Sequence, residues 1–292
     1  MAVAEPKPSP LPGGAAPGAG PADSQFRDIP YRVSEMPHRY GPHVHVLADP
    51  IALTHLARLC APSARHPEIF RLVRALYEQL LRAVINAEFP RVEAALPTRM
   101  QALTPCGVYR GQVVDPGAHV VTVGVARAGT YPSQVLFEYL ADLIAPDNVR
   151  QDHLVMNRVT DAAGAVTGAA IHGSKVGGAV EGRIVLFPDP MGATGSSPSM
   201  AIDHYKRSVE GGASARFVAM NLVMTPEYVR RMLADHPDVR LYAVRLDRGL
   251  SAPDVLATVP GERWDEERGL TDHQYIVPGA GGFGEVMNNS PV

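Results

Sequence analysis

The stretch Arg183–Ser197, RIVLFPDPMGATGSS, joins a strand pattern to a loop rich in glycine and hydroxyl residues. Its first part, Arg183–Phe187, contains the short apolar run typical of a strand buried on both faces of a parallel sheet. A helical pattern begins directly after the loop. Such a loop presents unpaired backbone N–H groups, with the positive end of a helix dipole behind them. The stretch therefore predicts an α/β sheet with an anion site at the carboxyl end of one strand.

The residues of this loop suit a sugar phosphate. Gly192 and Gly195 allow close approach of the backbone, and three hydroxyl side chains can donate hydrogen bonds to the same oxygens. Asp189 precedes the loop and is placed to accept hydrogen bonds from sugar hydroxyls. The alternative is a turn that only caps the helix. The expected phosphate-binding residues are Met191, Gly192, Ala193, Thr194, Gly195, Ser196 and Ser197.

Two segments resemble one protein family. DPMGATGSS, at 189–197, resembles the DPMLATGGS signature of the uracil phosphoribosyltransferases, which join uracil to phosphoribosyl pyrophosphate (PRPP). YIVPGAGGFG, at 275–284, resembles that family's uracil loop, YIVPGLGDAGD. HPDVRLYAVRLDRGL, at 236–250, resembles a third family segment, HPDVxxYTAAIDxGL. The resemblance implies a type I phosphoribosyltransferase fold, in which helices flank a parallel sheet with a small hood and a flexible hairpin arm.

Composition sets limits on the organisation of the chain. Its 292 residues allow one large α/β domain or two small ones. Residues 1–28 are rich in proline, alanine and glycine, and we expect them to be a disordered tail. Because the resemblance covers residues 31–285, we predict a single phosphoribosyltransferase-like domain at 29–287. Residues 251–271 replace a short turn of the family and form an atypical insert, for which a surface excursion or an oligomer contact is plausible.

Charge and hydropathy exclude several classes of partner. The formal charge of −3 gives no general reason to bind nucleic acid or an acidic membrane. No apolar run approaches the roughly 20 residues of a membrane span, and no secretory signal is evident at the start. Cys60 and Cys106 are too few for a disulfide framework. These features predict a cytoplasmic protein.

Further elements follow from hydrophobic patterns. Ile51–Leu59 and His66–Phe89 have helical periodicity, and in the family such helices contribute to dimer packing. His119–Val125 and Arg216–Val223 are predicted strands. The apolar stripe of the second helix comprises Ile69, Leu72, Val73, Leu76, Leu80 and Val84. Three histidines, His38, His43 and His45, suggest a metal site, but surface or strand positions are the better interpretation.

Three basic residues are candidates for the pyrophosphate side of the site. Arg127 follows the predicted strand in RAG, which resembles the family's LRAG, and in the family this arginine contacts pyrophosphate. Arg158 in MNRVTD and Lys175 in HGSKVGG resemble family positions in MYRNEET and YFxKLP. The segment Ala162–Gly173 suits either a hairpin that folds over bound substrate or an unimportant surface hairpin. Together with Asp189, these three are the expected catalytic residues.

Uracil recognition needs a donor for O4 and an acceptor for N3–H. We expect backbone groups of Ile276–Gly279 and Gly281–Phe283 to supply both, as the family's loop does. Cytosine reverses this polarity and would leave buried groups unpaired. Tyr275 is a candidate to stack near the ribose, or else a core residue. The expected uracil-binding residues are Tyr275, Ile276, Val277, Gly279, Gly281, Gly282 and Phe283.

The chain departs from the family pattern at several positions. Gly192 and Ser196 replace a leucine and a glycine in the phosphate loop. Gly282 replaces an aspartate associated with PRPP, Glu285 replaces a second aspartate, and Val286 replaces an arginine. Glu285 is therefore only a weak candidate site residue.

The leading hypothesis is a uracil phosphoribosyltransferase that forms UMP and pyrophosphate. The alternatives are a PRPP-dependent transferase for another pyrimidine-like base, or a catalytically silent nucleotide-binding homologue. Mg²⁺ is expected to be bound through substrate oxygens, without direct protein ligands. The resemblance also implies a homo-oligomer, either a dimer or a tetramer.

Overall fold

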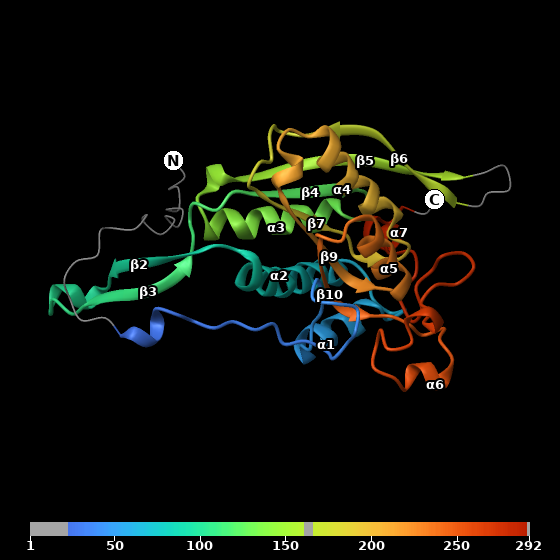
Figure 1. The fold of residues 1–292 in the computed structure, drawn as a ribbon, viewed down its shortest axis with the longest axis horizontal. Helices are drawn as coiled ribbons and strands as arrows, with labels where there is room; N and C mark the ends of the chain where they lie inside the picture. Colours follow the sequence, from blue (N-terminus) through green and yellow to red (C-terminus); the bar gives the residue numbers. More distant parts are fainter. Residues whose placement is uncertain (1–22, 161–165, 291–292) are drawn as a thin grey trace.

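An eight-stranded sheet organises the chain in the computed structural model, which describes residues 23–160 and 166–290 (Figure 1). Side chains of Ser24 and of residues 157–169 lie outside this description. The strand order is β1-β10-β9-β7-β4-β5-β6, with β8 beside β9, and only β5 and β6 pair antiparallel. The strands are β1 (Val44–Val46), β4 (Val120–Ala126), β5 (Val149–Thr160), β6 (Val166–Lys175), β7 (Ile184–Pro188), β8 (Met191–Gly192), β9 (Arg216–Met224) and β10 (Arg240–Leu246).

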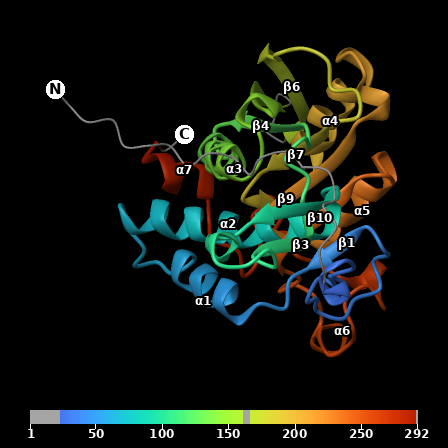
Figure 2. The same cartoon turned by 90° about the vertical axis from the view of Figure 1, so that its left-hand side faces the viewer.

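Helices cover both faces of the sheet (Figure 2). One face carries α1 (Pro50–Leu59), α2 (Glu68–Glu88) and α3 (Thr130–Leu143), and the other carries α4 (Ser196–Ser208) and α5 (Pro226–Asp235). Along β7, Ile184 and Leu186 enter the first core, whereas Val185 and Phe187 enter the second. Since successive strand side chains point to opposite faces, the apolar run of β7 is buried on both sides. The predicted α/β architecture, a parallel sheet flanked by helices, is confirmed.

The elements predicted from periodicity are present within a few residues of their expected ends. The predicted strands at His119–Val125 and Arg216–Val223 are β4 and β9. The predicted helices at Ile51–Leu59 and His66–Phe89 are α1 and α2. Every member of the predicted apolar stripe of α2 is buried. No helix in the described part of the chain has the length and apolar character that a membrane crossing requires.

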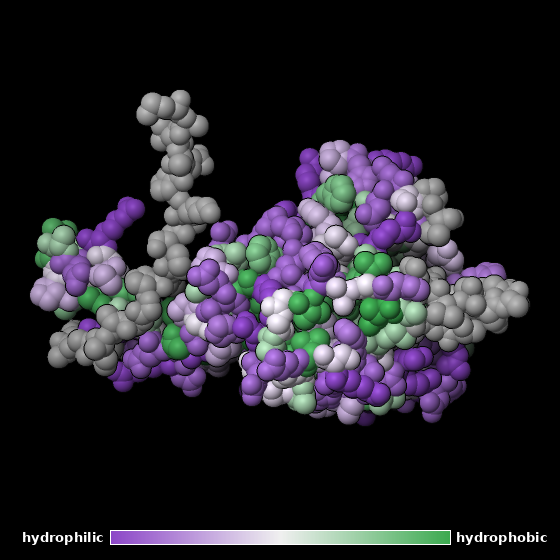
Figure 3. Space-filling model, turned by 90° about the horizontal axis from the view of Figure 1, so that it is seen from above, coloured by the Kyte–Doolittle hydropathy of each residue, from purple (hydrophilic) through white to green (hydrophobic). Residues whose placement is uncertain are grey.

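An antiparallel hairpin, β2 (Arg91–Pro97) and β3 (Val108–Val114), projects from the body (Figures 1 and 3). At its end, the side chain of Leu103 is 78% exposed. Before the sheet begins, a 3₁₀ turn at Ser24–Phe26 lies against β3, and the rings of Phe26 and Tyr109 are 6.3 Å apart. The remainder of the predicted tail, residues 1–22, lies outside the described residues, as does part of the predicted arm at Ala162–Gly173.

The histidine cluster sits at the β1 edge. His45 Nδ1 is 3.0 Å from a carboxylate oxygen of Glu35, and its ring stacks on Tyr242. His43 Nδ1 is 2.7 Å from the carbonyl oxygen of Pro237. Within residues 23–160 and 166–290, no three His, Cys, Asp or Glu side chains are grouped so that they would hold a metal.

The insert folds back onto its own domain. It contains the short helices α6 (Pro253–Leu256) and η5 (Trp264–Glu266). The carboxylate of Glu267 is fully buried and accepts hydrogen bonds from Arg248 Nη1 at 2.9 Å, from the Gly261 amide at 2.8 Å, and from the Tyr40 hydroxyl. The Trp264 ring packs edge-on against Tyr40 at 5.0 Å. These contacts make the insert an integral part of the domain.

Replacing Leu80 with alanine tests the core beneath α2. Leu80 is completely buried, so Leu80→Ala removes packed methyl groups and leaves a cavity. We expect the free energy of unfolding to fall by about 2–5 kcal/mol, measured by urea denaturation. The matched control, Leu103→Ala at the exposed hairpin end, should change it by less than about 0.5 kcal/mol. Equal losses in the two variants would contradict this assignment of the core.

Candidate active site

Three loops meet at the carboxyl ends of the parallel strands, where open α/β sheets bind ligands. They are the segment 127–129 after β4, the phosphate loop 189–197 after β7, and the base loop 274–283, which follows β10 and the insert. A Cβ atom on Gly129 would lie 2.8 Å from the carbonyl oxygen of Pro188, so the first loop packs directly on the end of β7. A Cβ atom on Gly249 would lie 2.8 Å from the carbonyl oxygen of Val277, so the end of β10 similarly approaches the base loop.

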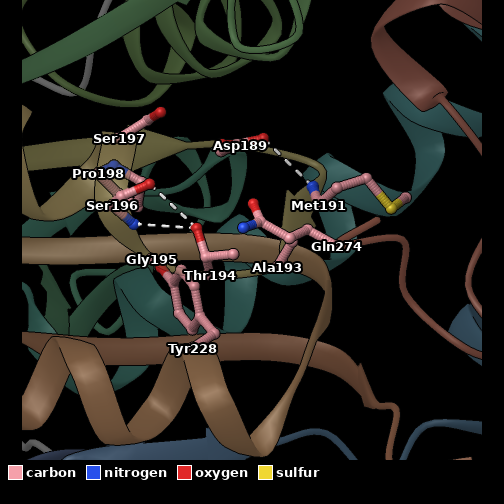
Figure 4. Close-up of a pocket in the computed structure, with 10 residues that line it drawn as sticks. All are labelled: Asp189, Met191, Ala193, Thr194, Gly195, Ser196, Ser197, Pro198, Tyr228 and Gln274. Carbon is pink, nitrogen blue, oxygen red and sulfur yellow. Dashed lines mark hydrogen bonds between the residues drawn. The ribbon is translucent and has the colours of Figure 1, made fainter. Parts of the chain in front are cut away.

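A pocket lies over the phosphate loop (Figure 4). It has about 460 Å³ of empty space, which includes space open to solvent. The amide of Gln274 points into it toward the phosphate loop. Its lining residues are Asp189, Met191, Ala193, Thr194, Gly195, Ser196, Ser197, Pro198, Tyr228 and Gln274. The pocket therefore contains the predicted phosphate loop and Gln274, the residue just before the YIVPG segment, whereas none of the predicted uracil-binding residues at 275–283 lines it.

The phosphate loop is shaped by internal hydrogen bonds. Gly195 has a φ of +76°, a left-handed conformation that favours glycine, and its carbonyl accepts the first helical bond from Ser199 at 3.0 Å. The hydroxyls of Thr194 and Ser196 are 3.0 Å apart. Among the described residues, the amides of Thr194, Gly195 and Ser197 have no acceptor. These N–H groups at the start of α4 lie where the sequence predicts an anion site.

Thr225 fixes the phosphate loop through hydrogen bonds to its backbone. Its hydroxyl donates to the carbonyl of Ala193 at 2.7 Å, and its amide donates to the carbonyl of Gly192 at 3.1 Å. The same hydroxyl caps α5 by accepting from the Tyr228 amide at 3.0 Å. Sequence reasoning missed Thr225, although a threonine followed by proline at a helix start is a recognisable capping signal.

Gly192 occupies a crowded position. A Cβ atom there would lie 3.1 Å from Cδ2 of Tyr228 and 3.2 Å from Cγ of Asn221, so both side chains fill the space that a larger residue would need. Tyr228 is fully buried beneath the loop. Burial raises the pKa of its hydroxyl, and the nearby Asp189 carboxylate raises it further, so the group stays protonated.

Asp189 stands half-buried at the rim of the pocket. Its backbone amide donates to the carbonyl of Met220 at 3.0 Å, and the Asn221 side chain donates to its carbonyl at 2.7 Å. One carboxylate oxygen accepts from the Met191 amide at 3.2 Å. The backbone is thereby fixed by neighbouring β9, while the carboxylate remains on the pocket wall (Figure 4).

The three basic candidates are placed differently. Arg127 is exposed on the loop after β4, where its guanidinium donates to the Ser290 hydroxyl at 2.8 Å. Lys175 ends β6 and pairs with His153, two strands beyond β4, so it is not brought to the Asp189 pocket. Arg158 lies on β5, and its side chain is outside the described residues.

Part of the base-loop backbone is hydrogen-bonded to other segments of the protein. The Val277 amide donates to the carbonyl of Gly269 at 2.8 Å. The Val277 carbonyl accepts from the Gly249 amide at 3.0 Å. The Gly279 amide donates to the Asp247 carboxylate at 2.8 Å. In the described structure the amides of residues 280–282 have no acceptor, so these three donors are not used within the protein.

The side chains of the base loop differ in their burial. Ile276 and Phe283 are buried and join the apolar core, so they support the loop. Tyr275 is 49% exposed, which excludes the alternative that it is a core tyrosine. Gln274, which sequence reasoning missed, has a positive φ of 63° and is the residue of this loop that lines the pocket. Only its position next to the YIVPG motif would have indicated it.

Comparison with known proteins shows the family. The family model described as uracil phosphoribosyltransferase matches residues 46–262. The chain belongs to the uracil phosphoribosyltransferase family. A uracil phosphoribosyltransferase of Rhodococcus jostii is 28% identical over 244 residues, covering 84% of this chain and 97% of the relative. One from Burkholderia pseudomallei is 30% identical over 212 residues, covering 72% of this chain and 82% of the relative.

A solved structure shares the fold of this family member. The AQ2163 protein of Aquifex aeolicus aligns with a TM-score of 0.63 and 18% identity, covering 85% of this chain and 99% of that one. At this identity the likeness concerns the fold alone.

The crowding at Gly192 predicts that restoring the family residue is harmful. In Gly192→Leu the new side chain must displace Tyr228 or Asn221, so we expect a lower melting temperature and about a tenfold or greater rise in KM for PRPP. Ser196→Gly, the matched control, also restores a family residue but adds no atoms, and should raise this KM less. A Gly192→Leu variant as active and stable as the original chain would contradict the assigned packing.

Proposed function

We propose that this protein joins uracil to PRPP, forming UMP and pyrophosphate. The observation that carries the proposal is the pocket shared by the phosphate loop and Gln274 of the base loop, in a chain that belongs to the uracil phosphoribosyltransferase family. The loop amides and the start of α4 suit the 5′-phosphate, and the Asp189 carboxylate suits the ribose hydroxyls. The adjoining base loop suits the pyrimidine.

The reaction displaces pyrophosphate from the anomeric carbon while positive charge develops on the sugar ring. A protein lowers this barrier by aligning the base nitrogen with that carbon and by stabilising the departing negative charge. Arg127 is a described basic residue that suits this task, because its loop packs on the end of β7 beside Asp189. Arg158 and Lys175 would join it from the β5–β6 hairpin if that segment moves toward the pocket on substrate binding.

Base selection follows from the free backbone groups. The amides of residues 280–282 can donate to O4 of uracil, and carbonyl groups of the same loop can accept from N3–H. Cytosine presents the opposite polarity at these two positions, so it would leave buried groups unpaired. We propose that this polarity, rather than a charged side chain, makes the site specific for uracil.

Mg²⁺ is proposed to arrive with PRPP. Asp189 is the one carboxylate among the residues that line the described pocket, which suits an ion held mainly through substrate oxygens and water. When bound, the ion would neutralise charge on pyrophosphate. The protein residues then have the tasks of orienting the ribose through Asp189 and holding the 5′-phosphate at Thr194–Ser197.

Assembly and location are also proposals. We propose a homo-oligomer, since α1 and α2 correspond to helices that contribute to dimer packing in the family. We propose a cytoplasmic location because Cys60 and Cys106 are both free thiols.

The central experiment incubates the purified full-length protein with labelled uracil, PRPP and Mg²⁺, and measures UMP and pyrophosphate. We expect stoichiometric formation of both products. A panel of other pyrimidine bases tests the alternative that Gly282 and Val286 favour a different acceptor. Binding of PRPP or UMP in calorimetry, with no turnover of any base, would instead establish a catalytically silent homologue.

Two substitutions test the roles of Asp189 and Arg127. Asp189→Asn removes the charge that orients the ribose, and Arg127→Ala removes a cation from the leaving-group side, so each should lower kcat about tenfold to a thousandfold. Asp203→Asn and Arg207→Ala are the matched controls, because this exposed ion pair lies on the outer face of α4. Unchanged turnover in both site variants would place the chemistry elsewhere.

A further inference from the structure

A buried ion pair lies directly behind the base loop. The Asp247 carboxylate, at the end of β10, is 1% exposed. Arg245 Nε donates to one of its oxygens at 2.5 Å, and Arg245 Nη2 donates to the other at 2.8 Å. That second oxygen also accepts the Gly279 amide at 2.8 Å, while Nη2 reaches the Gly279 carbonyl at 3.4 Å. The pair therefore holds both polar groups of one peptide residue in the base loop.

Gly279 is the point at which the base loop turns. Its φ is +55°, and a Cβ atom there would lie 2.2 Å from the Ile276 carbonyl oxygen, so the backbone doubles back at this residue. The free amides of residues 280–282 follow immediately. Their direction consequently depends on how firmly the Gly279 peptide groups are held.

The ion pair connects this turn to the rigid sheet. The Asp247 amide donates to the Met224 carbonyl at 2.8 Å, which continues the register of β10 with β9 beyond Arg245. Arg245 itself lies in that register opposite Val223. A carboxylate in this position needs a nearby cation, because a buried unpaired charge is strongly unfavourable. The guanidinium of Arg245 is that cation, and it also contacts the Gly279 carbonyl of the base loop.

Arg245 departs from the family pattern. Asp247 matches the aspartate in the family segment HPDVxxYTAAIDxGL, but Arg245 stands where that pattern has alanine. We infer that Arg245, acting through Asp247, is a positioning residue that orients the base-reading amides and thereby raises affinity for the pyrimidine base. This inference rests on the proposed function, because it assigns the base to residues 280–282.

The chain contains a matched ion pair away from the base loop. Arg150 Nε and Nη2 donate to the two oxygens of Asp152 at 2.9 and 3.0 Å, and Asp152 accepts the Gly177 amide at 2.9 Å. Asp152 is also 1% exposed. The two pairs share spacing, bidentate geometry, burial and a glycine amide, but only the Arg245–Asp247 pair touches the base loop.

The test compares Arg245→Ala and Arg245→Lys with Arg150→Ala and Arg150→Lys. We expect Arg245→Ala to raise KM for uracil about tenfold or more, since a small misplacement of binding groups is costly, while KM for PRPP changes by less than about twofold. Arg245→Lys, which keeps the charge but not the bidentate fork, should recover part of the loss. The Arg150 variants should leave KM for uracil within about twofold of the original value.

Hydrogen exchange of backbone amides separates the positioning role from the activity. Without substrates, Arg245→Ala and Arg245→Lys should both speed exchange at Gly279 and residues 280–283, and the Arg150 variants should not. Should Arg245→Ala fail to fold, Arg245→Lys carries the same comparison in exchange and KM. Unchanged exchange and unchanged KM for uracil in the Arg245 variants would overturn the inference. Absence of UMP formation by the original protein would overturn the proposed function, whereas the exchange result would still decide whether Arg245 holds the loop.

Discussion

The hydrogen bonds of Thr225 are the interaction on which the phosphate site depends. One buried side chain at the end of β9 joins the phosphate loop to the start of α5, through the Ala193 carbonyl and the Tyr228 amide. Thr225 donates to two carbonyls of the loop, and among the described residues the amides of Thr194, Gly195 and Ser197 have no acceptor. The loop is thus polarised before any ligand binds, which reduces the reorganisation that phosphate binding would require.

The base loop is held by a different arrangement. Gly269, at the end of the insert, accepts from the Val277 amide, and its own amide donates to the Glu227 carboxylate at 2.9 Å. Glu227 lies in the first turn of α5, the same helix that Thr225 caps. The phosphate loop and the base loop are therefore both fixed to the start of α5, so their spacing is set by one rigid element. The insert makes this connection for the base loop through Gly269.

Hydrophobic patterns in the sequence were sufficient to predict the parallel sheet and its helices, whereas the type I phosphoribosyltransferase fold was implied by the family resemblance. The apolar run of β7 and the stripe of α2 each satisfy one periodicity, and both are buried as that periodicity requires. The phosphate loop was predicted through its resemblance to the family signature, since a glycine-rich segment between a strand and a helix can also be a turn that only caps the helix. Gln274 and Thr225 were missed because their roles depend on contacts between distant segments, which local patterns do not encode. Val277 and Gly279 were expected to read the base, but partners at Gly269, Gly249 and Asp247 occupy their polar groups.

The departures from the family pattern are locally compensated. At Gly192 the missing leucine side chain is replaced by the ring of Tyr228 and the amide of Asn221. At Gly282 a Cβ atom would lie 2.8 Å from Oε2 of Glu285, so the carboxylate of Glu285 occupies the space into which a side chain at 282 would extend. Glu285 is the third residue of α7 (Phe283–Asn288), from which a glutamate side chain folds back toward the residue that precedes the helix. An aspartate at 282 and the glutamate at 285 would therefore compete for the same space.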